Sequence, residues 1–274
     1  MKKSALSFVL TTLLLFGSTS YTPTNASPSS RSKADDTTIT AGKTYQTRNI
    51  EVDAFNAITA GSAIDVVYTQ AEGGPTVEVY APDNIIDHIT VEVKDETLVI
   101  GRERHIRIKG RCQKVVRVSA PAVQRLQSSS AGDIILKNGL TTTGKVVIKA
   151  SSGGDITGEG IVCTDLHIDA SSAGDIQLKE ITCTHIEAKA GSAGDIELSG
   201  RCEKATYKTS SAGDINAKKM EAVDVDATAS SAGDISCHVS GRLTARTSSS
   251  GEISYKGNPS TIDYSPKKGL KKID

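Results

Sequence analysis

The chain has 274 residues, of which 37% are hydrophobic and 4% aromatic, and it contains no tryptophan. This size and composition fit one elongated domain or two short ones, and they exclude a large multi-domain enzyme. The 32 basic and 32 acidic residues cancel, so the chain lacks the positive surplus that is typical of proteins with a nucleic-acid partner.

Residues 1–26 are predicted to be a signal peptide. Lys2 and Lys3 form a basic start, and the apolar run from Ala5 to Phe16 is too short for a stable membrane span. We therefore expect an exported mature chain without a transmembrane span. Residues 27–46, which are rich in Ser, Thr and Asp, are predicted to be a flexible lead-in.

Residues 47–125 are predicted to form a less regular β section. Short runs in which Val or Ile alternates with polar residues are separated by breaks at 72–75 and 81–83, which predicts strands joined by turns. The segment GSAIDV, Gly61 to Val66, looks like a degenerate copy of a phrase that is repeated later. We expect this section to continue the later stack of strands or to cap it, because an uncovered end would expose sheet edge and core.

A seven-residue phrase occurs seven times within residues 126–259, as SSSAGDI, ASSGGDI, ASSAGDI, AGSAGDI, TSSAGDI, ASSAGDI and TSSSGEI. Its acidic residues are spaced 22, 20, 20, 19, 20 and 18 positions apart. A period of about twenty residues is typical of a solenoid, in which each unit buries its apolar face by stacking on its neighbours. We call these acidic residues the acidic ladder: Asp133, Asp155, Asp175, Asp195, Asp214, Asp234 and Glu252.

The residues between the phrases indicate strands. Leu166 and Ile168, like Ile186 and Ala188, alternate with polar neighbours. The predicted fold class is therefore all-β, a parallel β-helix or solenoid with coils of about 20 residues, for which the usual crossover preference favours the right hand. Residues 260–274 are predicted to be a short basic tail. Continuing the alternation through the phrase predicts an inward-facing stack of hydroxyls at Ser130, Ser152, Ser172, Ser192, Ser211, Ser231 and Ser249.

Several ordered segments resemble one bacterial family. They are FNAITAGSAIDVVYTQ at 55–70, VEVYAPDNIIDHITVEVKDETLVI at 77–100, VRVSAPAVQRLQSSSAGDI at 116–134 and YKGNP at 255–259. Together with the repeated GDI, they resemble the head GIN domain, also called putative autotransporter adhesin, over residues 47–259. The resemblance implies an exported β-helical protein of the bacterial envelope with no assigned biochemical activity. Its location would be the periplasm, the outer-membrane surface or the extracellular space.

The acidic ladder has two interpretations. A row of carboxylates on one edge could hold calcium or bind a cationic surface, because hard cations take several carboxylate oxygens. Alternatively, an aspartate that follows glycine accepts hydrogen bonds from neighbouring amides of its own turn and fixes each bend in the same way. We favour the structural interpretation, since calcium-binding solenoid repeats need a denser pattern of Gly and Asp.

The sequence shows no nucleophile with a base, because the five histidines share no position in the repeat with the serines. Cys163, Cys183 and Cys202 each stand twelve residues before an acidic residue, so they should lie one above another. Two of them could form a disulfide in an exported protein, or all three could be small apolar thiols in the core. A zinc site made with His185 is disfavoured, since a stacked column does not give tetrahedral geometry.

One basic strip lies in the irregular section. His105, Arg107, Lys109 and Arg111 share one face of a predicted strand, while Ile106 and Ile108 share the other. This cationic strip could bind an anionic glycan or a lipid head group by charge. The alternative is a solvated strand face whose charge is weakened by neighbouring acids.

These observations predict a non-enzymatic envelope or surface protein, which would use the repeated face as an adhesin or binding module for a glycan or a surface protein. The alternatives are a polysaccharide lyase or hydrolase on a β-helix scaffold and a purely structural envelope factor. Steps of 18 to 22 residues leave no room for the long loops that build a catalytic cleft. No catalytic residue and no metal or cofactor site is predicted, apart from possible calcium binding at the acidic ladder. The sequence predicts no oligomeric state. Because the chain has no tryptophan, aromatic contact with a glycan would depend on four tyrosines, Tyr68, Tyr80, Tyr207 and Tyr255.

Overall fold

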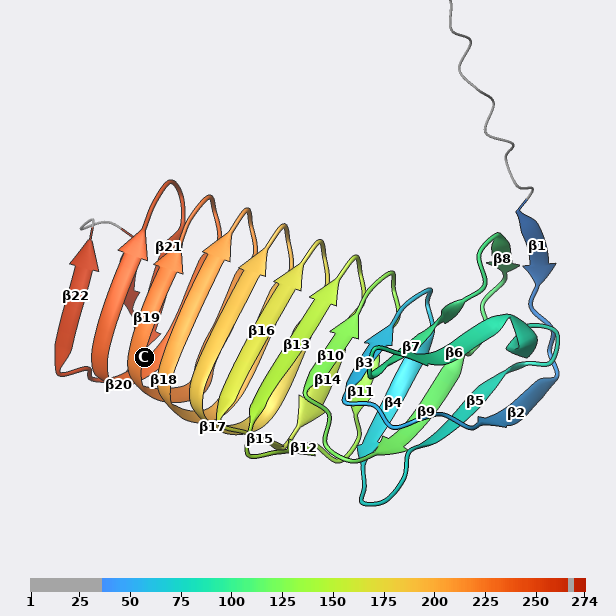
Figure 1. Cartoon of the computed structure of the whole chain (residues 1–274). Helices are drawn as coiled ribbons and strands as arrows, with labels where there is room; N and C mark the ends of the chain where they lie inside the picture. Colours follow the sequence, from blue (N-terminus) through green and yellow to red (C-terminus); the bar gives the residue numbers. More distant parts are fainter. Residues whose placement is uncertain (1–35, 266–268) are drawn as a thin grey trace, which may run out of the picture. The chain divides into compact units, whose positions relative to one another are not determined.

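The computed structural model describes residues 36–265 and 269–274, so the predicted signal peptide lies outside the described residues. The structure is almost entirely β (Figure 1). Its first part contains β1 (Thr37–Thr40), β2 (Tyr45–Ile50), β3 (Ala57–Ala60), β4 (Asp65–Gln70), β5 (Thr76–Pro82), the 3-10 turn η1 (Ile86–His88), β6 (Ile89–Lys94), β7 (Thr97–Arg102), β8 (Ile106–Lys109) and β9 (Val115–Ala120).

The repeats form a parallel β-solenoid, as predicted. Their strands are β10 (Arg125–Ser128), β11 (Ile134–Leu136), β12 (Leu140–Thr141), β13 (Lys145–Ser151), β14 (Ile156–Glu159), β15 (Ile161–Val162), β16 (Asp165–Ser171), β17 (Ile176–Gly191), β18 (Asp195–Ser210), β19 (Asp214–Ala229), β20 (Asp234–Thr247), β21 (Glu252–Lys256), β22 (Thr261–Ser265) and β23 (Leu270–Lys272). Each coil pairs in parallel with the next, so that Ile156 faces Ile176 and Ile176 faces Ile196 (Figure 1).

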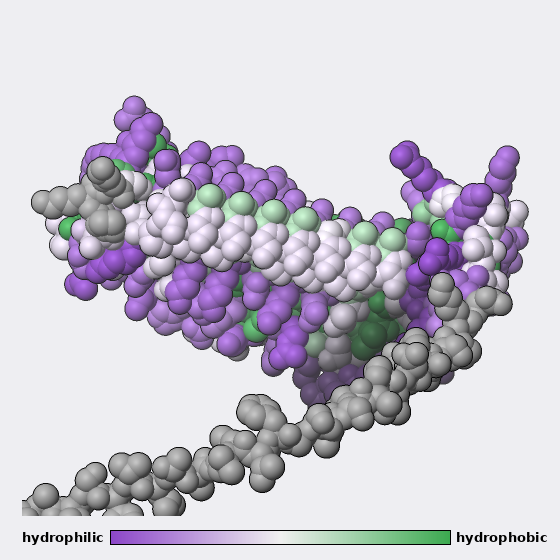
Figure 2. Space-filling model, turned by 90° about the horizontal axis from the view of Figure 1, so that it is seen from above, coloured by the Kyte–Doolittle hydropathy of each residue, from purple (hydrophilic) through white to green (hydrophobic). Residues whose placement is uncertain are grey.

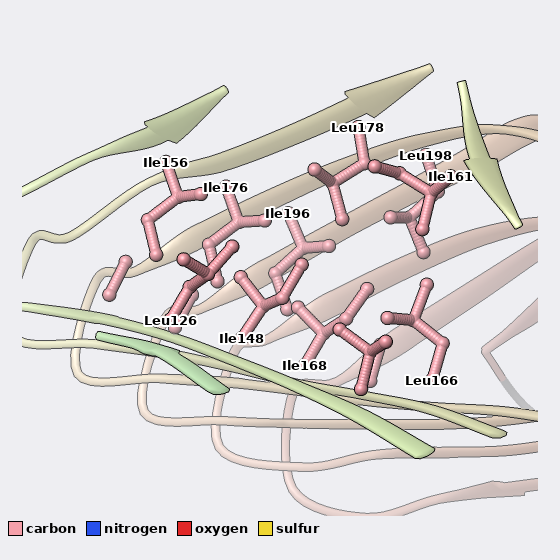
Figure 3. Close-up of a cluster of buried hydrophobic side chains, with 14 of the residues drawn as sticks. Leu126, Ile148, Ile156, Ile161, Leu166, Ile168, Ile176, Leu178, Ile196 and Leu198 are labelled. Atoms are coloured by element: carbon pink, nitrogen blue, oxygen red, sulfur yellow. The ribbon is translucent and has the colours of Figure 1, made fainter. Parts of the chain in front are cut away.

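The core consists of columns of like side chains. Leu126, Ile148 and Ile168 follow one another on β10, β13 and β16, and all three are buried (Figure 3). Stacking in this way buries apolar surface between coils, at roughly 1.5–3 kcal/mol for each large aliphatic side chain. The same column continues as Ala188 and then Tyr207, so a small residue makes room for the one buried aromatic ring in the coils.

The repeated phrase forms the turn between two sides of each coil. In the first six phrases, the residues three and two positions before the acidic residue take left-handed backbone angles, as shown by Ser192 with φ 51° and Ala193 with φ 59°. Both residues are exposed, and the turns form the regular pale row in Figure 2. The predicted inward stack of serines is therefore wrong, because two successive left-handed residues interrupt the period-two alternation. The buried hydroxyls lie five positions before the acid, at Ser128, Thr209 and Thr247.

The glycine before each acidic residue is required by space. A Cβ at Gly194 would lie 2.6 Å from the backbone carbon of Ala170 and 2.6 Å from the nitrogen of Ser171, both in the preceding coil. The same position in the segment 61–66 is Ile64, which is buried. The layer beyond β3 and β4 is formed by β7 and β9, and residues 103–114 between them carry no copy of the phrase.

The N-terminal section stacks its strands out of chain order. β3 pairs in parallel with both β7 and β10, and β4 pairs in parallel with both β9 and β11. The layer of β3 and β4 therefore lies between the first repeat coil and the later strands β7 and β9. Antiparallel strands end the stack, since β6 pairs with β7, β5 with β9 and β2 with β5. The section thus both continues the stack and caps it.

Two boundary predictions need correction. Residues 27–35 of the expected flexible lead-in lie outside the described residues, and its remainder, 36–46, contains β1, which pairs in parallel with β8 in a separate two-stranded sheet. The basic tail expected for residues 260–274 contains β22 and β23, which pair with β20 and β21 and extend the solenoid. These three strands were not predicted because each is short and none carries the repeated phrase.

Candidate functional site

The acidic ladder connects successive coils by hydrogen bonds. The backbone N–H of Asp155 donates to Oδ1 of Asp133 at 3.1 Å, and that of Asp175 donates to Oδ1 of Asp155 at 3.1 Å. The pattern recurs from Asp195 to Asp175 at 3.3 Å and from Asp234 to Asp214 at 3.1 Å. We had expected each carboxylate to accept from amides of its own turn, but these four carboxylates accept from the next coil. A carboxylate that accepts a backbone N–H forms a comparatively strong bond, so this row ties the coils together.

Partial burial changes the acidity of the ladder. The pKa values of Asp133, Asp155 and Asp195 are raised above 3.8, chiefly because burial penalises the charged form and also because neighbouring carboxylates repel. Asp65 is among the charges that raise the pKa of Asp133, so the row begins one layer earlier than the seven phrases. The degenerate copy at 61–66 was the sequence signal for this residue.

A shallow hollow of about 360 Å³ follows the middle of the ladder, lined by Asp175, Gln177, Asp195, Glu197 and Asp214 among others. Among the described residues, no group of three or more His, Cys, Asp or Glu side chains is arranged to hold a metal ion. Calcium binding at the ladder therefore stays a prediction. The observed role of these carboxylates is to accept hydrogen bonds between coils.

Three further hollows adjoin one another on an outer face of the coils. One of about 430 Å³ shares Lys145 and Val147 with a second of about 210 Å³. The second shares Asp169 and Lys189 with a third of about 390 Å³. These hollows follow one another across strands from β7 to β19, and we call them the outer-face groove. No sequence pattern predicts this groove, since its side chains differ from coil to coil and repeat no motif.

The outer-face groove carries charges of both signs. Nζ of Lys189 lies 2.9 Å from Oε1 of Glu187, and Nδ1 of His167 lies 3.2 Å from Oε2 of the same carboxylate. The hydrogen bond from Lys189 is the main cause that lowers the pKa of Glu187. Lys145 and Lys149, on either side of Val147, make no ion pair with any described residue. The groove therefore offers two unpaired ammonium groups beside an apolar side chain.

Two of the four tyrosines considered for glycan contact are excluded by burial. Tyr68 and Tyr207 are both fully buried. Tyr68 donates to the carbonyl of Pro121 at 2.6 Å, and burial raises its pKa to about 12. Tyr80 is half-buried and stacks on Tyr45, with ring centroids 5.0 Å apart. Tyr255 is also half-buried. Aromatic contact with a ligand is thus limited to partly exposed edges.

The cysteine column and His185 lie in different surroundings, because the thiols are buried and the imidazole is exposed. Cys163, Cys183 and Cys202 are free and buried, with Cys183 directly opposite Cys202, which fits the apolar thiol stack. Burial raises the pKa of Cys163 to about 12, so this thiol is a poor nucleophile. Nδ1 of His185 lies 3.0 Å from Asp165, on the solvent side of β16 and β17. No serine is placed with a histidine as nucleophile and base in the hydrogen bonds of the described residues.

The cationic strip lies on β8 and its flanks. His105, Arg107, Lys109 and Arg111 are all exposed, but only Arg107 and Lys109 belong to β8, because the backbone is left-handed at His105, with φ 66°, and at Gly110, with φ 99°. Asp36, just before β1, receives a hydrogen bond from Nε of Arg107 at 2.8 Å and lies 3.4 Å from Nδ1 of His105. The hydrogen bond from Arg107 is the main cause that lowers the pKa of Asp36. No sequence pattern points to Asp36 as a partner of the strip, because it lies about seventy residues earlier in the chain.

Comparisons with known proteins agree with this architecture. The family model described as "Putative auto-transporter adhesin, head GIN domain" matches residues 54–179 and 145–259. A putative adhesin from Bacteroides fragilis is 26% identical with a TM-score of 0.65, and the match covers 85% of this chain and 95% of that chain.

Two structures from Parabacteroides distasonis are more distant in sequence and show the fold alone. A putative adhesin is 21% identical with a TM-score of 0.78, over 86% of this chain and 100% of that one. A putative lipid binding protein is 22% identical with a TM-score of 0.70, over 87% and 100%. No curated protein matches the chain. In the part of the chain that the structure describes, no helix is long and apolar enough to cross a membrane.

Proposed function

The chain belongs to the family described as putative auto-transporter adhesin, head GIN domain, and from this membership we propose that it is an exported, non-enzymatic binding protein. Its stacked coils present an extended surface, and its partner is a polymer that lies across several coils, such as a glycan or a surface protein. The family description and the similar putative adhesin from Bacteroides fragilis support the class of function.

The outer-face groove is the observation that carries this proposal. Its hollows cross successive strands, so a partner lying in it would run across the coils and contact each in turn. With adjacent strands about 4.8 Å apart, a run of several coils gives a contact some tens of ångströms long. A small molecule would occupy only one of these hollows, whereas an extended polymer would use them together.

The described residues give little support to the enzymatic alternative. Catalysis of glycan cleavage requires paired carboxylates or a basic residue held in a cleft that excludes water. Here the acidic ladder accepts hydrogen bonds between coils, and Glu187 in the outer-face groove is held by Lys189. These carboxylates are committed to contacts within the protein.

An array of glycans and extracellular-matrix proteins, probed with the exported chain with and without calcium, tests the proposal. We expect binding to one class of extended polymer, reduced at least tenfold by V147W, which would fill the outer-face groove at half-buried Val147. The matched control is V223W, since Val223 is 51% exposed and lines none of the hollows described above. A silent array, or equal losses for both variants, would contradict the proposal and favour a structural role.

A further inference from the structure

The cationic strip is the second surface that the fold sets apart. Residues 102–117 contain seven Arg or Lys residues and a single acidic residue, Glu103, in a chain whose formal net charge is zero. The structure places the centre of this segment on β8, outside the main sheet. A positive excess is therefore concentrated in one short excursion between β7 and β9.

β1 holds this excursion in a defined shape. Its strand pairs with β8 over four residues, from Thr37 opposite Ile106 to Thr40 opposite Lys109. Backbone N–H groups also donate from Thr37 to His105 at 2.7 Å and from Ala41 to Lys109 at 2.9 Å. The backbone of the strip from His105 to Lys109 is thus held by β1, which lowers the entropy lost when a ligand binds.

Only one end of the strip is neutralised within the protein. Asp36 pairs with His105 and Arg107, and these are the ion pairs that the described residues provide to the strip. Lys109 and Arg111 are exposed and have no ion pair within the same part of the chain. Lys109 is the last residue of β8, and Arg111 follows a bend at Gly110, whose φ is 99°, so the two cations lie together just at the end of the strand.

We propose that the cationic strip, through Lys109 and Arg111, binds a linear anionic polysaccharide. Neighbouring exposed cations that no carboxylate neutralises attract the repeated anionic groups of such a polymer by charge. A bilayer surface would be better served by a broad face with apolar side chains that insert. The exposed large hydrophobic residues, Ile135, Val162, Val223 and Ile262, all belong to the repeat coils or the last strands, and none lies on β8.

The test uses two variants with the same change in net charge. K109Q/R111Q removes the unpaired end of the strip but leaves Arg107 and its pair with Asp36 in place. K218Q/K219Q removes two exposed, unpaired lysines of β19 in the described structure. Binding of heparin and of polygalacturonate would be measured at low and at physiological salt, with neutral dextran as the uncharged polymer. Melting temperature would be checked for each variant.

We expect heparin or polygalacturonate to bind the parent chain, and K109Q/R111Q to weaken that binding about tenfold, while K218Q/K219Q changes it less than twofold. Added salt should weaken binding to the parent, and dextran should not bind. Equal losses in both variants would overturn the proposal, since net charge alone would explain them. Binding to vesicles of phosphatidylglycerol with none to either polyanion would overturn it too, in favour of a membrane surface. The result is independent of V147W, so this proposal can fail while the outer-face groove stands.

Discussion

The repeat coils and the N-terminal section use the same parallel pairing but reach it by different routes. In the coils, each strand pairs with the strand one period later, as Ile148 does with Ile168. In the N-terminal section, β3 pairs with β7 about forty residues later and with β10 about seventy residues later. The comparison shows that a period along the chain specifies a stack, whereas a cap depends on pairings that no period announces.

The largest effect is expected at the repeated glycine. G194A should lower the free energy of unfolding by more than about 3 kcal/mol, because the new Cβ would meet backbone of the preceding coil that cannot move aside. Urea unfolding followed by circular dichroism measures this change. The control is G74A in the N-terminal section, where a Cβ has open space and no neighbour within 4 Å. Equal stability of the two variants would show that the coils do not pack as tightly as described.

The matching position in the N-terminal section should behave in the opposite way. I64A should lower the free energy of unfolding by about 2–3 kcal/mol, because it leaves a cavity where a buried isoleucine packs. A larger side chain is thus favoured at Ile64 and excluded at Gly194, although both precede the acidic residue of the phrase. Unchanged unfolding of I64A would mean that this layer is not part of the core.

Substitutions in the acidic ladder should change the free energy of unfolding by less, and should differ less between the coils and the N-terminal section. D155A should lower stability by about 1 kcal/mol, because the N–H of Asp175 loses its acceptor. D155N should lose much less, since its amide oxygen can still accept. D65A in the N-terminal section should also have little effect, because the Asp65 carboxylate has no hydrogen bond in the described structure. If D155N were as damaging as D155A in thermal unfolding, charge and not the hydrogen bond would explain the ladder.

The pH dependence should differ between the two regions, with the smallest effect. The pKa values of Asp133, Asp155 and Asp195 are raised in the fold, so their charged forms destabilise it at neutral pH. Their contribution to stability should therefore rise as pH falls through the raised pKa values towards 3.8, by less than about 0.5 kcal/mol each because solvent screens them.

Asp36 should respond in the opposite sense. Its pKa is lowered, so its contribution to stability is present above pH 3.8 and is lost as pH falls through the lower folded value.

To test the raised pKa values of the acidic ladder, unfolding at pH 7 and pH 4.5 would be compared for the parent chain and for D133N/D155N/D195N. On going from pH 7 to pH 4.5, the free energy of unfolding of the parent should rise relative to that of the variant. A fall in the parent's free energy of unfolding relative to that of the variant would contradict the raised pKa values.

The sequence predicted the repeat coils well because their signal is local and repeated. Leu166 and Ile168 showed the strand period, and the spacing of the phrase placed like residues over one another. The predicted inward stack of serines was wrong because the alternation of residue types does not indicate that Ser192 and Ala193 both have left-handed backbone angles. Prediction from the sequence also failed on β1 and β23, since short strands are ordered by partners far away in the chain.

The candidate sites were predicted less completely, for the same physical reason. The cationic strip could be found because its residues alternate in the sequence, but its partner Asp36 is placed by the pairing of β1 with β8. The outer-face groove depends on side chains that come together from separate coils, such as Lys145 and Asp169. Neither its depth nor its free charges follow from a motif.

Removal of one whole coil tests the central claim, that the phrase is a device for stacking interchangeable coils. Deleting residues 176–195 would join Asp175 to Ile196 and let Ile156 stack on Ile196 with the phrase intact, because Ile156, Ile176 and Ile196 occupy one column. We predict a folded protein with cooperative thermal unfolding and a β-rich circular dichroism spectrum, shortened by about 4.8 Å in small-angle scattering. A shortened chain that fails to fold, while the parent folds under the same conditions, would contradict the account.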